Sequence, residues 1–353
     1  MNQSELTSFV KDTAKSLGFD YIGIAKGEPV DSTHAREFKE WIAAGRHGDM
    51  RYLENNLEKR LNPCLLVPAC KSVLCVAMNY APAEEISADS YQLSYYAYGQ
   101  DYHDIVKGKL FTLLSTITKQ FVQEGLRKDL VNTAVDSLEQ ALLGNSKVCV
   151  DTVPILERYW AQRAGLGWIG KSGQLIIPKA GTYFFLGEIL LPIELDYDEP
   201  ASNRCGNCSK CVRACPTHAL VGNGMMDCRK CLSYLTIEYR GEQLKDPVSN
   251  ETLPISLAMG NSIYGCDICS QVCPWNRFSR PTKIEAFKPR TELLAMTKQD
   301  WESLTKEKYQ RLFKGSAVKR AKYTGLIRNI KTVSIKETIL KKENSNQSTT
   351  EKE

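Results

Sequence analysis

Short apolar runs alternate with amphipathic stretches over the first 200 residues of the chain. The first residues, MNQSELTSFVKDTAKSLGF, place apolar side chains at helical spacing between charged ones. Three strand-like runs follow: SVLCVAMNY at 72–80, KVCVDTVP at 147–154 and TYFFLGEILLP at 182–192. Helical periodicity that alternates with such runs predicts an α/β domain over residues 1–200.

The pattern changes at residues 195–204, where LDYDEPASNR is rich in turn-forming residues. A cysteine-rich segment then extends over residues 201–280, and CLSYLTIEYRGEQ within it has a helical pattern. Several basic helices are expected over residues 281–340. The final segment, residues 341–353, is so polar that we expect it to be disordered.

Composition and charge narrow the class of protein. The 353 residues are 42% hydrophobic and 25% charged, which is ordinary for a globular chain of two domains. No stretch approaches the roughly 20 apolar residues of a membrane span, and the first helix lacks a signal-peptide core, so we expect a cytoplasmic protein. Residues 301–342 contain twelve Lys or Arg and three Asp or Glu. Such a block suggests a polyanionic partner, although a solvated helical surface has the same composition.

Thirteen cysteines are present, and nine of them lie between residues 205 and 273. In a reducing cytosol such a group binds metal more often than it forms disulfides. The other four stand alone in apolar sequence and are expected to be buried packing residues: Cys64, Cys70, Cys75 and Cys149.

The spacing of the nine cysteines is that of a ferredoxin with two [4Fe–4S] clusters. The run C-x2-C-x2-C-x3-C-P is formed by Cys205, Cys208, Cys211 and Cys215. The run C-x2-C-x3-C-P is formed by Cys266, Cys269 and Cys273. In this arrangement three thiolates of the first run hold one cluster and its fourth reaches the other, so the eighth thiolate is Cys228 or Cys231. Cysteine pairs also build zinc sites, but zinc requires neither this run nor a proline after both runs.

An electron relay needs an acceptor, and the first 200 residues contain no dinucleotide-binding GxGxxG and no phosphate-binding GxxxxGKS. Residues from Asp101 nearly match DxHxxG, a loop whose histidine binds the cobalt of cobalamin in some enzymes. Val106 stands where that motif has glycine. The near match therefore gives no reason to expect His103 as a cobalt ligand.

Further motifs occur in a fixed order between about residue 55 and residue 330. They are KRLNPCLLVPACKSV, YGQDYHDIVKGKL, VDTVPILERYWAQRAGLGWIGKSG, GTYFFLGEILL, CLSYLTIEYRG, IYGCDICSQVCPWN and AKYTGLIRN. VDTxPxxER, AGLGWxGK and CLSYLTIE in this order, together with the ferredoxin runs, resemble the epoxyqueuosine reductase family, which is related to reductive dehalogenases.

This resemblance implies an α/β (α+β) nitroreductase-like domain that binds cobalamin base-off, beside a ferredoxin-like module with two [4Fe–4S] clusters and a basic helical C-terminal region. The family reduces the epoxide of epoxyqueuosine at the tRNA wobble position to queuosine, with loss of water. It uses cob(I)alamin and electrons relayed by the clusters. We therefore expect a tRNA substrate, an electron donor such as flavodoxin or ferredoxin, and a monomer.

The resemblance also selects the eighth cluster ligand. Family members usually have DARRC before CLSYLTIE, and this chain has DCRKC at residues 227–231. Cys231 is thus the matched ligand, and Cys228 is an extra thiol. One cluster is then expected on Cys205, Cys208, Cys211 and Cys273. The other is expected on Cys215, Cys231, Cys266 and Cys269.

Asp151 in the VDT motif matches the aspartate that the family carries there, and the resemblance implies that it is the acid that protonates the epoxide oxygen. Its pKa would have to be raised by burial beside the corrin. The alternative is an ordinary helix cap, since Pro154 follows closely. Besides Asp151, the expected corrin contacts are Arg60, Tyr102, His103, Lys171 and Ser172. Each of these could instead be a surface or capping residue.

Three questions stay open at this point. The tyrosines of one cluster could form core, a lid or a base-stacking surface: Tyr95, Tyr96, Tyr98 and Tyr102. The segment at 121–152 is longer than is usual in the family, and a C-terminal helical-repeat extension of some members is not found. Two other functions remain possible, a non-catalytic electron carrier and a reductive dehalogenase, although the latter typically has a twin-arginine leader.

Overall fold

The computed structural model describes residues 1–123, 142–245 and 249–335. The expected disordered tail and most of the long segment before Asp151 lie outside these residues. None of the described helices is long and apolar enough to cross a membrane.

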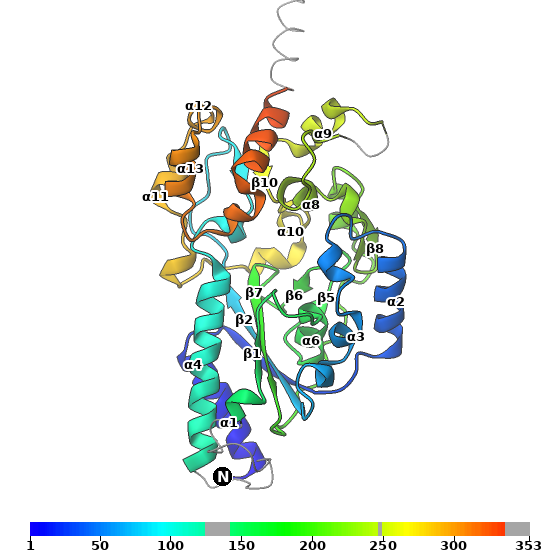
Figure 1. Ribbon diagram of the computed structural model, residues 1–353, viewed down its shortest axis with the longest axis vertical. Coiled ribbons are helices and arrows are strands. Elements are labelled where there is room, and N and C mark those ends of the chain that lie inside the picture. Colours follow the sequence, from blue (N-terminus) through cyan, green and yellow to red (C-terminus); the bar gives the residue numbers. More distant parts are fainter. Residues whose placement is uncertain (124–141, 246–248, 336–353) are drawn as a thin grey trace, which may run out of the picture.

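A four-stranded sheet organises the first 200 residues (Figure 1). In order across the sheet, its strands are β1 (Tyr21–Lys26), β2 (Ser72–Asn79), β7 (Phe184–Leu191) and β4 (Lys147–Cys149). Each neighbouring pair is antiparallel, so the domain is α+β. The three runs predicted as strands are confirmed as β2, β4 and β7. β1 was not predicted, because it is a short run of six residues with a glycine near its centre.

Helices cover both faces of this sheet, because successive strand residues point to opposite sides. The helices on one face are α1 (Gln3–Ser16) and α4 (Tyr102–Gln123). Phe185, Ile189 and Leu191 of β7 pack with them. The other face is covered by α6 (Glu157–Arg163), whose Trp160 packs against Leu190 of β7. A capping box between Asn2 and Glu5 fixes the start of α1 and contributes about 1 kcal/mol.

The cysteine-rich and C-terminal segments build a second core above the sheet in Figure 1. Its elements are α7 (Lys210–Ala214), β8 (Leu220–Gly222), β9 (Met225–Met226), α8 (Leu232–Ile237), α9 (Thr252–Met259), β10 (Ser262–Tyr264), α10 (Ile268–Gln271), α11 (Thr291–Leu294), α12 (Lys298–Glu302) and α13 (Lys306–Leu312). A last helix covers residues 322–335. The basic C-terminal helices are therefore confirmed.

A segment of the first 200 residues crosses into this second core. The short strand β3 (Gln92–Leu93) pairs in parallel with β10, and Tyr91 and Tyr98 are buried in the same core. Tyr95 and Tyr98 thus belong to the core rather than to a base-stacking surface. Tyr96 donates a hydrogen bond from its hydroxyl to that of Tyr264, at 3.0 Å.

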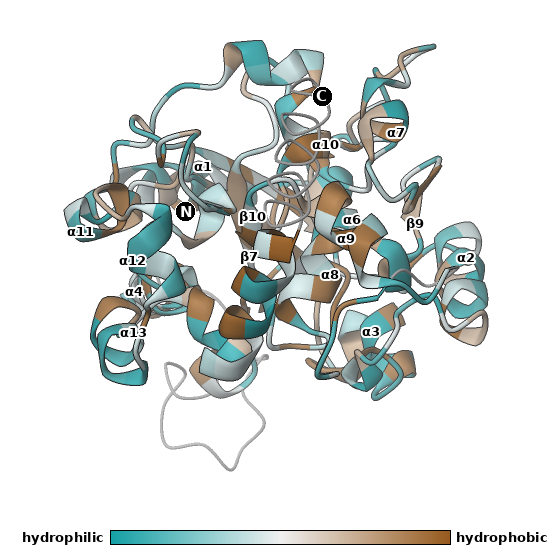
Figure 2. Ribbon diagram, turned by 90° about the horizontal axis from the view of Figure 1, so that it is seen from above, coloured by the Kyte–Doolittle hydropathy of each residue, from teal (hydrophilic) through white to brown (hydrophobic). Residues whose placement is uncertain are grey.

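The remaining elements form the flank of the sheet domain. They are α2 (Ser32–Ala43), α3 (Leu57–Leu61), β5 (Trp168–Ile169) and β6 (Leu175–Ile176). Seen from above, α2 and α7 lie at the edge of the molecule while β7, β10 and α8 lie nearer its middle (Figure 2). Trp41 of α2 donates its indole N–H to the Met226 carbonyl at 2.7 Å, and the Tyr234 hydroxyl donates to Asp49 Oδ2 at 2.9 Å. These bonds attach the flank to the cysteine-rich segment.

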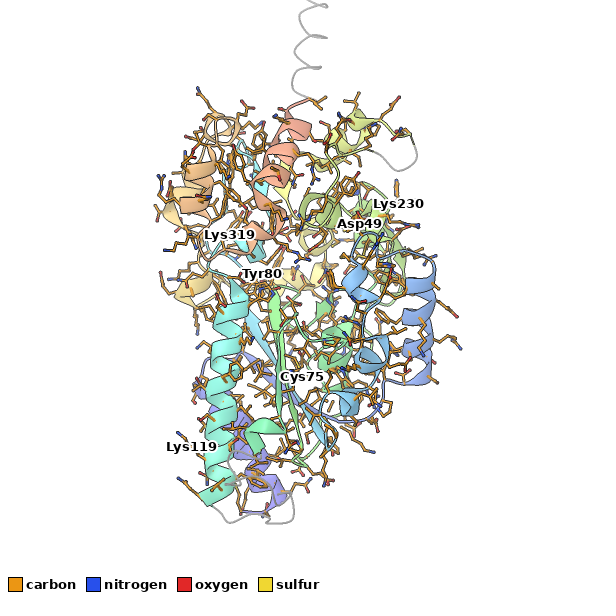
Figure 3. All side chains as sticks on the ribbon, viewed as in Figure 1. Asp49, Cys75, Tyr80, Lys119, Lys230 and Lys319 are labelled. Atoms are coloured by element: carbon orange, nitrogen blue, oxygen red, sulfur yellow. The ribbon has the colours of Figure 1, made fainter. Side chains whose placement is uncertain are left out.

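The four isolated cysteines occupy the positions expected of packing residues. Cys70, Cys75 and Cys149 are buried, and Cys64 is half-buried. Figure 3 shows Cys75 within the sheet and Tyr80 near its upper end, towards the second core.

Candidate functional site

The structure brings three of the predicted site residues together, Tyr102, His103 and Asp151. Tyr102 and His103 begin α4, and Asp151 follows β4 by two residues. The Tyr102 hydroxyl donates a hydrogen bond to Asp151 Oδ2, and His103 Nε2 lies 3.5 Å from the same oxygen. His103 Nδ1 lies 2.7 Å from Asp101 Oδ1. The Tyr102 ring stacks on Phe185 at 4.2 Å, so its hydroxyl is held at Asp151 by the sheet.

The backbone of Asp151 has a left-handed conformation, with φ of 51°. Non-glycine residues seldom adopt it, and such strain costs about 1–3 kcal/mol. The Asp151 N–H donates to Glu157 Oε1 in the first turn of α6, which helps to hold this conformation. The turn directs the carboxyl towards Tyr102 instead of leaving it as a helix cap.

Burial raises the pKa of the Asp151 carboxyl, and the nearby charge of Asp101 raises it further. Its hydrogen bond with the Glu157 carboxyl and the charge of Arg158 act in the opposite direction. A hydrogen bond between two carboxyl groups requires at least one proton. The Asp151 side chain is still 47% accessible. The site therefore combines a carboxyl whose protonated form is favoured with access for a reactant.

Two glutamates lie near Asp151, and neither was predicted as a site residue from the sequence. Burial raises the pKa of Glu157 well above its ordinary value, and the charges of Glu188 and Asp151 add to the effect. Glu188 is fully buried in β7, directly opposite Cys75 of β2 and Cys149 of β4. Neither of its carboxylate oxygens has a hydrogen-bond partner among the described residues. An unpaired charge there would be costly, so Glu188 is held in its neutral form.

The signal for both glutamates was in the sequence. Glu157 ends the VDTxPxxE pattern, and Glu188 is the one charged residue in the strand FFLGEILL. A lone glutamate in a strand that is otherwise apolar is uncommon unless it is paired or functional. What sequence alone could not show is that Glu188 points to the same side of the sheet as α6 and its Glu157.

The other predicted corrin contacts are distributed differently. Arg60 is 8% exposed, and its terminal nitrogens donate to the carbonyls of Ile155 and Tyr52 at 3.5 and 3.4 Å. Its Nε has no partner among the described residues, which leaves a buried donor near the Asp151 loop. Lys171 instead donates to the Gly206 carbonyl at 2.7 Å, and Ser172 is buried beside it in the chain. The structure therefore does not place these two with the Asp151 group.

The eight thiols expected as cluster ligands form two groups. Cys273 lies near three thiols of the first run, which raise its pKa in addition to burial: Cys205, Cys211 and Cys208. The pKa of Cys269 is raised to about 12, mainly by burial and then by its neighbours Cys231, Asp267, Cys211 and Cys215. The pKa of Cys266 is also raised to about 12, mainly by burial and then by Cys231, Cys269 and Asp267.

Cys228, the extra thiol, lies beside Cys231 of the second group. It is 8% exposed in the second core, and Cys231 is the neighbouring thiol that raises its pKa after burial itself. No three Cys, His, Asp or Glu side chains within the described ranges are arranged to hold a single metal ion. Thiolates that each bind a different iron of a cluster stand farther apart than the ligands of one zinc ion. The thiol arrangement thus fits clusters.

In each of the two groups, one cysteine sulfur accepts a hydrogen bond from an N–H donor. The Trp168 indole N–H donates to Cys205 Sγ at 3.4 Å, and the Ala219 N–H donates to Cys215 Sγ at 3.2 Å. Such bonds stabilise the thiolate and tune the reduction potential of a cluster.

Part of the basic C-terminal block is engaged in structural contacts. The Arg320 guanidinium bonds to both oxygens of Glu238, with distances of 2.7 to 3.1 Å. Arg328 donates to the main-chain carbonyls of Leu235, Tyr239 and Gly241. Other bases of the block are exposed and form no ion pair with a described carboxylate: Lys306, Lys314, Lys319, Lys322 and Lys331. Only this second set is available to a polyanion.

Comparison with known proteins identifies two matching families. Residues 60–152 match "Epoxyqueuosine reductase QueG, DUF1730", and residues 204–276 match "4Fe-4S double cluster binding domain". An epoxyqueuosine reductase of Cellulophaga algicola is 39% identical over 94% of this chain and 99% of its own length. One from Escherichia coli is 34% identical over 94% of this chain and 81% of its own.

A solved structure is similar over nearly the same range. It is the crystal structure of an epoxyqueuosine reductase with a tRNA-Tyr epoxyqueuosine-modified stem loop, at 25% identity. The TM-score is 0.77, with coverage of 94% of this chain and 82% of that chain. The fold therefore matches along both the sheet domain and the cysteine-rich core.

The neutral state of Glu188 predicts how stability depends on pH. An unfolded glutamate titrates near pH 4.3, whereas the folded pKa is well above that value. Between the two pKa values the folded state binds more protons, so this group lowers the free energy of unfolding by up to about 1.4 kcal/mol per pH unit as pH rises. Glu188→Gln, which stays neutral, should flatten the fall in thermal midpoint as the pH rises above the value at which an unfolded glutamate titrates. Exposed Glu194→Gln is the control, and equal slopes in wild type and Glu188→Gln would contradict the assignment.

Proposed function

Because this chain belongs to the epoxyqueuosine reductase family, we propose that it reduces the epoxide of epoxyqueuosine at the tRNA wobble position to queuosine, with loss of water. The observation that carries the proposal is the protonatable Asp151 carboxyl, held by Tyr102 and Glu157 yet accessible. The relative crystallised with an epoxyqueuosine-modified stem loop supports the same substrate.

Conversion of an epoxide to an alkene and water consumes two electrons and two protons. An alkoxide is a poor leaving group, so an acid must act at oxygen while a reductant acts at carbon. Asp151 is placed to donate the first proton. Glu157 is hydrogen-bonded to Asp151, and its pKa is raised more strongly. Glu157 can therefore return a proton to Asp151 from the buried side. A simple electron carrier has no need of such an acid pair, which favours the enzyme over that alternative.

Cobalamin, when bound, supplies the strongly reducing nucleophile for carbon. Tyr102, His103 and Asp151 would border it, and the unpaired Nε of buried Arg60 fits an acceptor such as a corrin amide. Both ring nitrogens of His103 face carboxylates, which supports a base-off corrin without a protein histidine on cobalt. The contacts of Lys171 and Ser172 with corrin stay predictions.

Two [4Fe–4S] clusters would supply one-electron transfers to this site. The two thiol groups described above support the expected ligand sets, with Cys231 as the eighth ligand. We keep the division into a catalytic domain at 1–200, a cluster module at 201–280 and a tRNA-contacting region at 281–340. A cytoplasmic monomer reduced by flavodoxin or ferredoxin fits a tRNA substrate.

The exposed lysines of residues 301–335 are proposed to contact tRNA phosphates. Arg320 and Arg328 are excluded from this role because their guanidinium groups are bonded to Glu238 and to main-chain carbonyls. Lys319, Lys322 and Lys331 are left as the main contributors, with Lys319 labelled in Figure 3.

Asp151→Asn tests the proposed acid. The amide keeps the shape and the Tyr102 contact but cannot supply the proton, so single-turnover reduction should slow by about 10²- to 10⁴-fold. Affinity for tRNA should change little. Asp104→Asn is the matched control, because Asp104 is an exposed aspartate in the first turn of α4, next to His103. Full activity of Asp151→Asn would show that another group is the acid.

Iron content tests the eighth ligand. Wild-type protein should contain about eight irons per chain. Cys231→Ser should lose about half of that iron, and Cys228→Ser should keep both clusters. Anaerobic iron analysis with the absorbance spectrum measures both variants. The reverse pattern would assign the ligand to Cys228.

Combined Lys319→Gln, Lys322→Gln and Lys331→Gln substitutions test the tRNA surface. Each lost phosphate contact should reduce the slope of log affinity against log salt by about 0.7 to 0.9. Single-turnover reduction at saturating tRNA should be unchanged. A control variant with Lys107→Gln and Lys119→Gln removes two positive charges from α4 instead, and it is compared with Lys319→Gln and Lys322→Gln alone. If the triple variant kept its tRNA affinity and its salt dependence, the basic block would be only a solvated surface.

A further inference from the structure

The two thiol groups differ in their access to solvent. Cys208 of the first group is exposed, whereas the other seven expected ligands are half-buried. Cys269 of the second group lies near Tyr80 and Tyr183, at the end of the sheet domain. An electron that enters from outside therefore meets the first group before the second.

The two segments that contain the thiols of the first group have positively charged side chains and no negatively charged ones. Residues 200–226 and 268–284 contain no Asp or Glu. They contain six exposed bases: Arg204, Lys210, Arg213, Arg277, Arg280 and Lys283. None of the six forms an ion pair with a described carboxylate. Unlike Arg320 and Arg328, these charges are not needed to hold the fold.

Contacts place the two basic segments side by side. α7, with Lys210 and Arg213, packs on α10, and α7 lies at one edge of the molecule (Figure 2). The rings of Trp168 and Trp275 meet at 4.9 Å, and Trp168 bonds to Cys205, which joins the first run to the residues after Cys273.

A hollow opens beside Cys273. Its volume is about 550 Å³, and Arg277 and Arg280 are among its lining residues. One acidic residue, Glu85, also lines it, and its carboxylate is bonded to the Tyr95 hydroxyl. Two of the six bases, Arg277 and Arg280, thus line the hollow together with Cys273 of the first group. We call the six bases and this hollow the basic face.

We propose that the basic face is the docking surface for an acidic one-electron carrier protein, an inference that rests on the proposed function. In each encounter the carrier is oxidised by one electron and the cluster at Cys205, Cys208, Cys211 and Cys273 is reduced by one. Two encounters supply the two electrons for one epoxide. A carboxylate-lined carrier gains attraction and orientation from the ring of bases, while its redox group approaches the exposed Cys208.

Binding of oxidised flavodoxin is the direct measurement. Lys210→Glu with Arg213→Glu, and separately Arg277→Glu with Arg280→Glu, should each weaken flavodoxin binding at low ionic strength by about 10-fold or more. Lys107→Glu with Lys119→Glu is the control of equal charge change; Figure 3 shows Lys119 far down α4. Anaerobic titration calorimetry of cluster-loaded protein measures the affinities, and iron analysis checks cluster content.

The rate of cluster reduction separates docking from damage to the cluster. Bleaching by reduced flavodoxin should slow in both pairs of variants, and bleaching by the small cation of reduced methyl viologen should not. Unchanged flavodoxin affinity in both pairs would overturn the proposal. If the variants were bleached more slowly by reduced methyl viologen as well, to the same extent as by reduced flavodoxin, the proposal would be overturned. It would also be overturned if the variants lost tRNA affinity to the same extent as flavodoxin affinity, because the basic face would then be an RNA-binding surface. Wild-type turnover with reduced methyl viologen tests the proposed function independently of the carrier.

Discussion

A carboxyl group keeps its proton near neutral pH only where protein replaces the water that would stabilise its anion, and the site depends on this constraint. The sheet provides such a place between β2, β7 and β4, where Glu188 has no hydrogen-bond partner among the described residues. Glu157 and Asp151 lie progressively closer to solvent. Three features hold these carboxyl groups in place: the strained turn at Asp151, the stacking of Tyr102 on Phe185 and the start of α6.

The same constraint separates acid chemistry from electron transfer within one chain. Thiolates bear negative charge and are stabilised by N–H donors such as that of Trp168, whereas the Glu188 carboxyl has no donor among the described residues that would favour its anion. The two environments meet near Tyr80 and Tyr183, between the sheet domain and the second thiol group. Electrons and protons can therefore approach a substrate from different sides.

Local patterns were sufficient for the strands and for the cysteine-rich segment that matches a double-cluster domain. The choice of Cys231 over Cys228 came from the family resemblance and stays a prediction. Period-two apolar runs and a fixed cysteine spacing depend only on near neighbours in the chain. Glu188 was missed because its importance arises from strands far apart in sequence. For the same reason, only the fold shows that Arg320 bonds to Glu238 and that Arg328 bonds to three main-chain carbonyls. The placement of Lys171 beside Gly206 likewise needed the tertiary structure.

The pairing of β3 with β10 has a consequence for biosynthesis. Gln92 pairs with Ser262, so about 170 residues must be translated before the partner of β3 exists. At 5–20 residues per second this takes roughly 10–30 s. During that time Tyr91, Tyr95 and Tyr98 have no core to enter and are exposed on the nascent chain. The sheet domain can form early, but this segment must wait, and it is the part of the chain for which a chaperone on the ribosome would matter most.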